Sequence, residues 1–244
     1  MSDQAKLSAT IQPVCVLTGG TSGIGLEAAK KFAREGYRIV TCGRDLSRLK
    51  KARNEIGAVA SNAEILAIEM DLARPRDTGK LIDRALERFG RIDVLVLCAA
   101  VAQLKSLQEM SSQEFETAID VNIRAQFYLT QAAWQAMLRQ GKGGTIVNVS
   151  SLSAVDPFPG FSVYGACKAW DDLFCVALAH EGKPHGIRVH SIRPGAVETP
   201  MLRGLFPDFP ADQALAPSAV ADLIWAVCQE ACRDSCGQPI NIRR

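Results

Sequence analysis

The stretch Thr18-Gly19-Gly20-Thr21-Ser22-Gly23-Ile24-Gly25 decides the fold, because it joins a short apolar run at residues 14–18 to a helical pattern at 25–35. Glycines let the backbone turn sharply and let a pyrophosphate come close, while free N–H groups and the helix dipole attract its charge. A glycine cluster alone also fits an ordinary tight turn from strand to helix. The strand before it and the helix after it favour a dinucleotide-binding loop, with contacts from Gly19, Thr21, Ser22, Gly23, Ile24 and Gly25.

The alternation of short apolar runs and amphipathic stretches continues to the end of the chain. Apolar, β-branched runs predict strands at residues 14–18, 38–42, 65–70, 93–98, 145–149, 187–192 and 239–242. Helical spacing predicts helices at residues 25–35, 46–56, 78–89, 114–139, 166–181 and 219–232. Strands without polar alternation are typical of a parallel sheet with helices on both faces. We therefore expect an α/β, doubly wound fold in a single domain over 1–244, with about seven strands.

Several residues mark the expected ends of these elements. Gly36, Gly57, Gly90 and Gly182 stand where helices should end in a left-handed residue. Ser111 followed by Glu114 predicts a capping box at the start of the long fourth helix. The proline-rich stretch 195–217 lies between the sixth strand and the last helix, and we expect it to form a substrate lid.

Composition excludes several classes of function. The chain has 244 residues, 48% of them hydrophobic, and 28 basic against 26 acidic residues give a net charge of +2. With charges scattered along the chain, neither nucleic acid nor an anionic membrane is an expected partner. Residues 1–13 lack the apolar core of a secretory signal, and the longest apolar run, 94–102, is too short to cross a bilayer. We expect a cytoplasmic protein.

Cysteine and histidine are expected to serve structure only. The eight cysteines form no CxxC pair, which favours reduced thiols over disulfides. Cys228, Cys232 and Cys236 are four apart, so we expect small apolar thiols on a buried helical face, not a metal site, because zinc spacing is absent. His180, His185 and His190 are spaced without a convergent face, and no metal is expected.

The end of the second predicted strand bears on cofactor choice. A dinucleotide fold usually places an acid there for the adenosine ribose, whereas this chain has Gly43-Arg44. A guanidinium can hold a 2′-phosphate by a bidentate contact, so we expect NADP(H) over NADH, although Arg44 could also simply lie in solvent beside Asp45. Asp71, with Leu72 after the third strand, is a candidate for the adenine, or for capping a turn.

A second group of residues has the composition of a proton-transfer site. Tyr164 and Lys168 are four apart at the start of a helix, so their side chains share a face, and an ammonium there stabilises phenolate. Ser150-Ser151 ends the fifth strand, on the edge where α/β sheets bind ligands. Asn122 is inside the long fourth helix, where a buried polar side chain needs a hydrogen-bond partner. In the turn at residues 193–199, the backbone polar groups and the Thr199 hydroxyl could bind a carboxamide. Each also has an ordinary structural explanation.

Taken together, the order of these motifs resembles the short, single-domain branch of the short-chain dehydrogenase/reductase family, over residues 14–242. The resemblance implies a Rossmann fold in which Tyr164 is the acid/base, Ser151 orients the reacting oxygen, Lys168 binds the nicotinamide ribose, and Asn122 holds a water in a proton relay. It implies catalytic residues Asn122, Ser151, Tyr164 and Lys168, and cofactor contacts that also include Ala99, Pro194, Gly195, Val197 and Thr199.

Two departures from the family pattern stand out. Cys98-Ala99-Ala100 replaces the usual Asn-Ala-Gly after the fourth strand, which should cost local hydrogen bonding more than chemistry. His190 stands where relatives often carry Asn.

The resemblance implies an NADP(H)-dependent carbonyl reductase or alcohol dehydrogenase, with 3-oxoacyl thioesters as a candidate substrate class.

Two rival functions were weighed against this one. A non-catalytic NADP(H)-sensing regulator would have no physical need for the tyrosine, and an isomerase of related type usually has a longer carboxyl-terminal domain.

The substrate should lie against residues 153–161 and the lid, whose apolar side chains favour a hydrophobic, medium-sized molecule. The helices predicted at 114–139 and 166–181 resemble those by which the family pairs subunits, which implies a homodimer or homotetramer.

Overall fold

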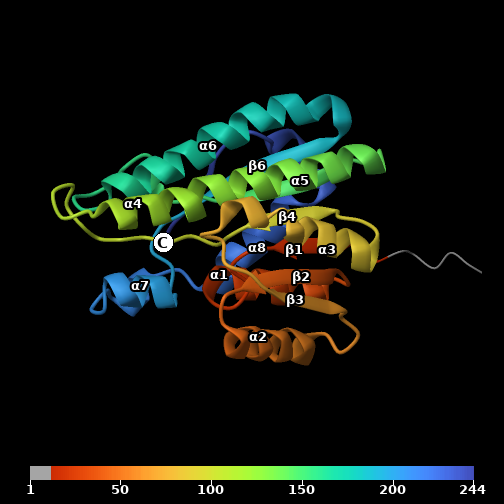
Figure 1. Ribbon diagram of the computed structural model, residues 1–244, viewed down its shortest axis with the longest axis horizontal. Helices are drawn as coiled ribbons and strands as arrows, with labels where there is room; N and C mark the ends of the chain where they lie inside the picture. Colours follow the sequence, from red (N-terminus) through yellow and green to blue (C-terminus); the bar gives the residue numbers. More distant parts are fainter. Residues whose placement is uncertain (1–11) are drawn as a thin grey trace, which may run out of the picture.

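A computed structural model describes residues 12–244 and contains a sheet of seven parallel strands in the order β3-β2-β1-β4-β5-β6-β7. Each of the strands predicted from the sequence is present, and the doubly wound α/β fold is confirmed (Figure 1). The strands are β1 (Val14–Leu17), β2 (Arg38–Gly43), β3 (Ile65–Glu69), β4 (Val94–Leu97), β5 (Gly144–Val149), β6 (Ile187–Pro194) and β7 (Ile240–Ile242).

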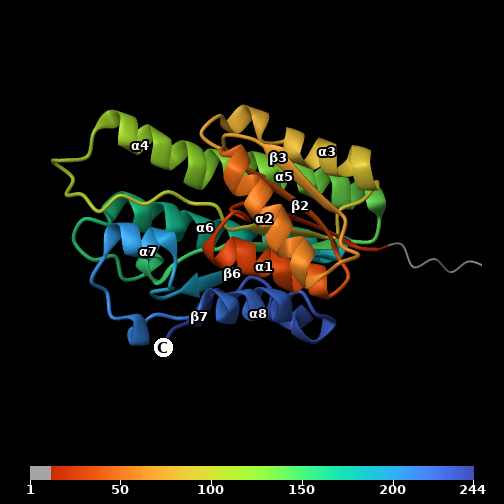
Figure 2. The same ribbon diagram turned by 90° about the horizontal axis from the view of Figure 1, so that it is seen from below.

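Helices cover both faces of this sheet. One hydrophobic core joins the sheet to α3 (Lys80–Phe89), α5 (Ala125–Gln140) and α6 (Ser162–Gly182). The other core joins it to α1 (Gly23–Arg34), α2 (Leu46–Val59) and α8 (Pro217–Val227), which lie in the foreground of Figure 2. The strands β1 and β4 are almost wholly buried, as expected when both faces of a sheet are packed.

The helix predicted at 114–139 is divided into three segments. The capping box of Ser111 and Glu114 is confirmed at the start of α4 (Ser112–Ile119). A π-helical turn, Asp120–Arg124, then connects α4 to α5 and places Asn122 in the interior. Because a π turn inserts an extra residue between hydrogen-bonded partners, it changes which side chains face inward.

The predicted helix ends are right at two glycines and wrong at two. Gly36 and Gly90 have φ of 83° and 74°, which is the left-handed conformation that glycine adopts without strain. Gly57 lies inside α2, which continues to Val59, and Gly182 has a right-handed φ of −75°. The left-handed turn after α6 is made by Gly186 instead, after a short 3₁₀ segment, Lys183–His185.

The carboxyl-terminal region also departs from the prediction. The helix expected at 219–232 is α8, which ends at Val227, and a 3₁₀ segment, Glu230–Ser235, follows with a kink at Cys232. The expected helical face of Cys228, Cys232 and Cys236 is therefore wrong. Only Cys228 of these is buried, and all eight cysteines of the chain are free thiols.

The segment predicted as a lid contains the short helix α7 (Pro200–Leu205) and a 3₁₀ turn, Ala211–Gln213. A bridge between Val197 and Leu215 pairs the two ends of this segment, so the residues between them extend outward as a loop. In both ribbon views α7 lies at the same end of the molecule as α4 (Figures 1 and 2). Within the described part of the chain, no helix is both long and apolar enough to span a membrane.

Candidate active site

The glycine-rich loop between β1 and α1 has the backbone that the sequence predicts. Gly19 has φ of 73°, and a Cβ atom added at Gly25 would lie 2.4 Å from the carbonyl oxygen of Gly19. Ser22 precedes α1 in extended conformation, and the first turn of the helix has no acidic side chain. The helix N-terminus therefore presents N–H groups and a positive dipole end that fit a pyrophosphate.

This loop forms one side of a cavity of about 470 Å³. The loop lies between β1 and β4, where the strand order of the sheet reverses and open α/β sheets bind their ligands. Of the predicted cofactor contacts, the cavity brings together Gly19, Thr21, Ser22, Gly23, Ile24, Gly25, Arg44, Asp71, Leu72, Ala99, Tyr164 and Thr199. The residues present thus fit a dinucleotide.

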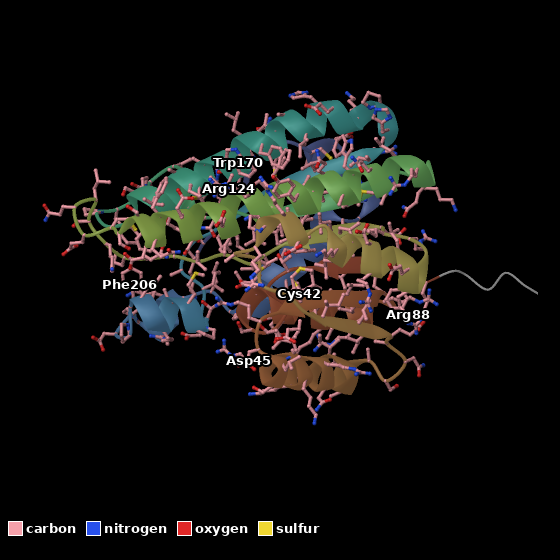
Figure 3. All side chains as sticks on the ribbon, in the orientation of Figure 1. Cys42, Asp45, Arg88, Arg124, Trp170 and Phe206 are labelled. Carbon is pink, nitrogen blue, oxygen red and sulfur yellow. The ribbon has the colours of Figure 1, made fainter. Side chains whose placement is uncertain are left out.

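Two cations line the adenosine half of this cavity. Arg44 directly follows β2, and Arg48, from the first turn of α2, also lines the cavity. The neighbouring Asp45 caps α2, because its Oδ1 accepts hydrogen bonds from the backbone N–H groups of Ser47 at 2.8 Å and Arg48 at 3.1 Å. Figure 3 shows Asp45 at the start of α2. Arg48 was not among the predicted cofactor contacts. Its place in the cavity depends on where α2 begins, which the sequence pattern alone does not fix.

Asp71 has one of the two roles considered for it, and its contact with the adenine stays a prediction. Its Oδ1 accepts a hydrogen bond of 3.0 Å from the Ala73 N–H, so it caps a turn, and it also lines the cofactor cavity. The loop after β4 is held by Thr18, whose hydroxyl oxygen accepts from the backbone N–H groups of Cys98 and Ala99, both at 3.1 Å. Thr18 therefore anchors the backbone at the Cys98-Ala99-Ala100 departure.

Tyr164 joins this cavity to a second one. The second cavity, of about 590 Å³, is lined by Ser151, Tyr164, Pro194, Gly195, Val197 and Thr199 among others. Ser150 does not serve the same purpose as Ser151, because it is 3% exposed and its hydroxyl donates to the backbone oxygen of Lys168 at 3.0 Å. Both serines line the cavity, and the role of Ser151 in orienting the reacting oxygen stays a prediction.

Lys168 lies beneath Tyr164 and is 1% exposed. Its Nζ donates to the backbone oxygen of Val149 and to Oδ2 of Asp171, each at 2.9 Å, and lies 5.8 Å from the centre of the Tyr164 ring. Burial opposes the charge of Lys168, but Asp171 and Tyr164 more than offset this and raise its pKa. Burial raises the pKa of Asp171 to about 6, against the opposing effect of Lys168.

The pKa of Tyr164 lies above its ordinary value, although Lys168 acts to lower it as expected. Burial is the main cause of the increase. The Lys168 ammonium and a hydrogen bond with Ser151 act in the expected direction, whereas the carboxylate of Asp171 adds to the increase. The buried counter-ion of Lys168, Asp171, was not predicted from the sequence. The spacing of three residues between them on a helix is the signal that could have revealed it.

Asn122 is fully buried in the π turn and finds its partner in the loop after β4. Its Oδ1 accepts from the Val101 N–H at 2.9 Å, and its Nδ2 donates to the Val101 carbonyl at 2.8 Å. The side chain thereby fastens this loop to the helix. Asn122 and Lys168 both lie behind the cavity walls, with Val121 and Tyr164 in front of them. The predicted water relay at Asn122 stays a prediction.

The turn after β6 connects the two cavities. The Gly195 N–H donates to the Ile242 carbonyl at 2.9 Å, which holds the turn against β7. Thr199 caps α7 by accepting from the Leu202 N–H at 3.2 Å and lines both cavities, together with Ile24, Tyr164 and Met201. The cofactor cavity and the second cavity are therefore continuous at Tyr164.

The histidines stand apart from this site, whereas Cys42 and Cys98 line the cofactor cavity. His190 is 0% exposed in β6, its Nε2 lies 3.6 Å from the Cys236 sulfur, and burial and Arg188 lower its pKa to about 4. Among residues 12–244, no three His, Cys, Asp or Glu side chains come together as metal ligands would.

Comparison with known proteins agrees with this geometry. A family model described as short chain dehydrogenase matches residues 13–209. An uncharacterized oxidoreductase of Staphylococcus epidermidis is 31% identical over 219 residues, which make up 89% of this chain and 92% of that protein.

Solved structures share the fold over nearly the whole chain. A 3-ketoacyl-(acyl-carrier-protein) reductase from Brucella melitensis, in complex with NADH, has a TM-score of 0.85 at 27% identity, over 96% of this chain and 98% of that one. A variant of actinorhodin polyketide ketoreductase with NADPH has a TM-score of 0.88 at 27% identity, over 95% of this chain and 96% of that one.

Proposed function

Because this chain belongs to the short-chain dehydrogenase family, whose members are oxidoreductases, we propose that it transfers a hydride between NADP(H) and a carbonyl or secondary alcohol. The observation that carries the proposal is the position of Tyr164, which lines both cavities and has Lys168 behind it. The rival interpretation, a sensor without catalysis, gives no reason for an acid/base group at the junction of the two cavities.

The choice of NADP(H) over NADH rests on charge at the adenosine end. Arg44 and Arg48 line the cavity with their side chains exposed, and Asp45 is committed to capping α2. Asp45 also lines the cavity, but a 2′-phosphate would meet two guanidinium groups against this one carboxylate, whose Oδ1 already caps α2. One related structure contains NADH and another contains NADPH. The preference of this chain is therefore inferred from its own residues 44–48.

The residues of the site divide the chemistry between them. Bound nicotinamide supplies a hydride to a carbonyl carbon or accepts one from an alcohol carbon. Tyr164 donates the proton of its hydroxyl to the carbonyl oxygen during reduction and accepts one from the alcohol during oxidation. Ser151 orients the same oxygen by a hydrogen bond. Lys168 stabilises the phenolate form of Tyr164 and has one N–H left for the nicotinamide ribose.

The assembly and the lid are further parts of the proposal. Residues 198–214, between the bridged Val197 and Leu215, cover the second cavity and close over the substrate.

Apolar side chains remain exposed on the paired helices α4/α5 and α6, among them Phe115, Phe127 and Leu173. We assign this face to pairing of subunits in a homodimer or homotetramer. A cytoplasmic location stays a prediction.

The first experiment measures NADPH consumption at 340 nm with a panel of ketones and aldehydes, in parallel with NADH. Turnover that depends on the carbonyl, with NADPH preferred, is the expected result. Binding of either nucleotide without turnover of any carbonyl or alcohol would contradict the proposed function.

A further inference from the structure

We infer that the carbonyl substrate is an uncharged aryl ketone, or the matching alcohol, whose aromatic ring packs on a wall of phenylalanines beside Tyr164. The inference rests on the proposed function and names the substrate class of the same site. It follows from three observations: the composition of the second cavity, the geometry of its aromatic rings and its charge.

The second cavity is apolar except around the reacting groups. Its volume of about 590 Å³ is within the range of pockets that hold small organic ligands. The polar groups that line it include Ser151 and Tyr164 at one end. The remainder is mostly aliphatic and aromatic, with four phenylalanines: Phe158, Phe161, Phe206 and Phe209. Ser153, Asp156 and Thr199 also line the cavity, but aliphatic and aromatic side chains make up most of its wall, which favours a substrate that is largely hydrocarbon.

The phenylalanines form a continuous aromatic surface that starts at Tyr164. The Phe161 ring meets the Tyr164 ring edge to face, with centroids 5.2 Å apart and planes at 85°. Phe161 also stacks with Phe206 at 6.0 Å and 18°, and Phe158 lies 4.6 Å from Phe161 and 5.8 Å from Phe206. Since aromatic rings prefer edge-to-face or offset contacts, a flat ring fits this surface better than a flexible alkyl chain does.

The aromatic surface spans two elements, one of them movable. Phe158 and Phe161 precede α6, whereas Phe206 ends α7 in the loop that we propose as the lid. Figure 3 shows Phe206 beside α7 and Asp45 at the start of α2. Because Phe161 and Phe206 already stack on each other, a substrate ring would pack against the surface that the two elements share.

Charge excludes the anionic alternatives. Of the side chains that line this cavity, all within residues 12–244, only the exposed Asp156 carries a full charge. The lid cation Arg203 is already bound by Glu198 and by the carbonyls of Pro207 and Phe209. A carboxylate or phosphate on the substrate would lose its hydration without gaining a partner and would be repelled by Asp156. Oxo acids therefore fit poorly, and the charged part of an acyl carrier would have to stay outside the cavity.

The test compares four substrates at saturating NADPH: acetophenone, butanone, acetoacetate and acetoacetyl-CoA. We expect kcat/KM for acetophenone to exceed that for butanone by about tenfold or more, because a buried phenyl ring adds apolar contact. Acetoacetate and acetoacetyl-CoA should be poorer than butanone. Equal values across the panel, or preference for either anion, would overturn the inference while leaving the proposed function in place. NADPH binding without turnover of any of the four would overturn both.

Variants at Phe206 separate ring packing from folding. Phe206→Ala should lower kcat/KM for acetophenone about tenfold and change that for butanone less than about twofold. Phe206→Leu retains apolar volume without the ring and should give an intermediate loss for acetophenone. Leu107→Ala, at a side chain that is 80% exposed and does not line the cavity, is the control and should match the wild type. A Phe206→Ala enzyme with unchanged melting temperature and equal losses on both ketones would contradict the assigned ring contact.

Discussion

The Lys168 ammonium and the Asp171 carboxylate form an ion pair 2.9 Å long that is almost wholly closed to solvent, with exposures of 2% and 0% for the two side chains. Asp171 is on α6, one turn beyond Lys168, so Tyr164 has both a cation and an anion beneath it. The second oxygen, Oδ1 of Asp171, has no hydrogen-bond partner among the described residues. The negative charge of Asp171 nevertheless raises the pKa of Tyr164, with Lys168 and the nearby Asn148 side chain as its compensating groups.

The first prediction concerns the pH dependence of alcohol oxidation, for which Tyr164 must act as a base. The Asp171 charge raises the pKa of Tyr164, so Asp171→Asn should lower it, provided that Lys168 keeps its bond to the Val149 carbonyl. The rising limb of kcat/KM should then move about one pH unit toward lower pH. Asp172→Asn is the matched control, because Asp172 binds Ser191 and Arg193 and not Lys168. An unmoved limb in Asp171→Asn would contradict this role of the carboxylate.

The second prediction concerns cofactor choice. Arg44→Ala should weaken NADPH binding about tenfold or more, because a charge-assisted contact to phosphate is lost, and should change NADH binding less than about twofold. Arg48→Ala should act in the same direction. Lys50→Ala, on the exposed side of α2 and outside the cavity lining, should leave both affinities unchanged. Nicotinamide fluorescence titration measures these affinities, and equal losses for NADPH and NADH in Arg44→Ala would disprove phosphate recognition there.

The third prediction concerns stability in mild acid. Burial and Arg188 hold the pKa of His190 at about 4, so the folded state favours the neutral ring. The resulting stability is complete above the unfolded pKa of about 6.5 and is lost as pH falls toward 4. Between pH 7.5 and pH 5 the free energy of unfolding should therefore fall by about 2 kcal/mol more in the wild type than in His190→Asn. Urea unfolding at both pH values measures this difference, and identical pH dependence in the two proteins would be the contrary result.

The fourth prediction concerns assembly. Leu173 on α6 is 71% exposed, and the aromatic side chains of Phe127, Trp170 and Phe174 lie close to one another on the same pair of helices. Leu173→Asp would bury an unpaired charge in a subunit interface and should shift the protein toward monomer in analytical ultracentrifugation. Arg139→Asp, with its side chain near the end of α5, is a comparison for the effect of charge alone. A wild type that sediments as a monomer would rule out this assembly.

Much of the fold was predictable because it depends on periodicity. Seven apolar runs of strand length, separated by helical patterns, allow few alternatives to a parallel sheet. The capping box at Ser111 and Glu114 was also predictable, since both of its hydrogen bonds are local. The glycines at 57 and 182 were not, because a helix continues past a glycine when its packing outweighs the conformational cost.

The parts of the site that escaped prediction depend on tertiary contacts. The π turn at Asn122 is not a pattern of residue types; it goes with the contact between Asn122 and the backbone of Val101, twenty-one residues away. The effect of Asp171 on Tyr164 depends on burial, which spacing alone does not measure. The position of Phe206 opposite Phe161 depends on how residues 198–214 fold back over the sheet.

Tyr164→Phe tests the central claim most directly, because it removes one hydroxyl and keeps the ring contact with Phe161. Measured with acetophenone, butanone and their alcohols, kcat/KM should fall about a thousandfold, while the affinity for NADPH stays within about twofold of the wild type. This result would identify Tyr164 as the proton donor and acceptor. Turnover within about tenfold of the wild type, with NADPH still bound, would contradict the proposed mechanism.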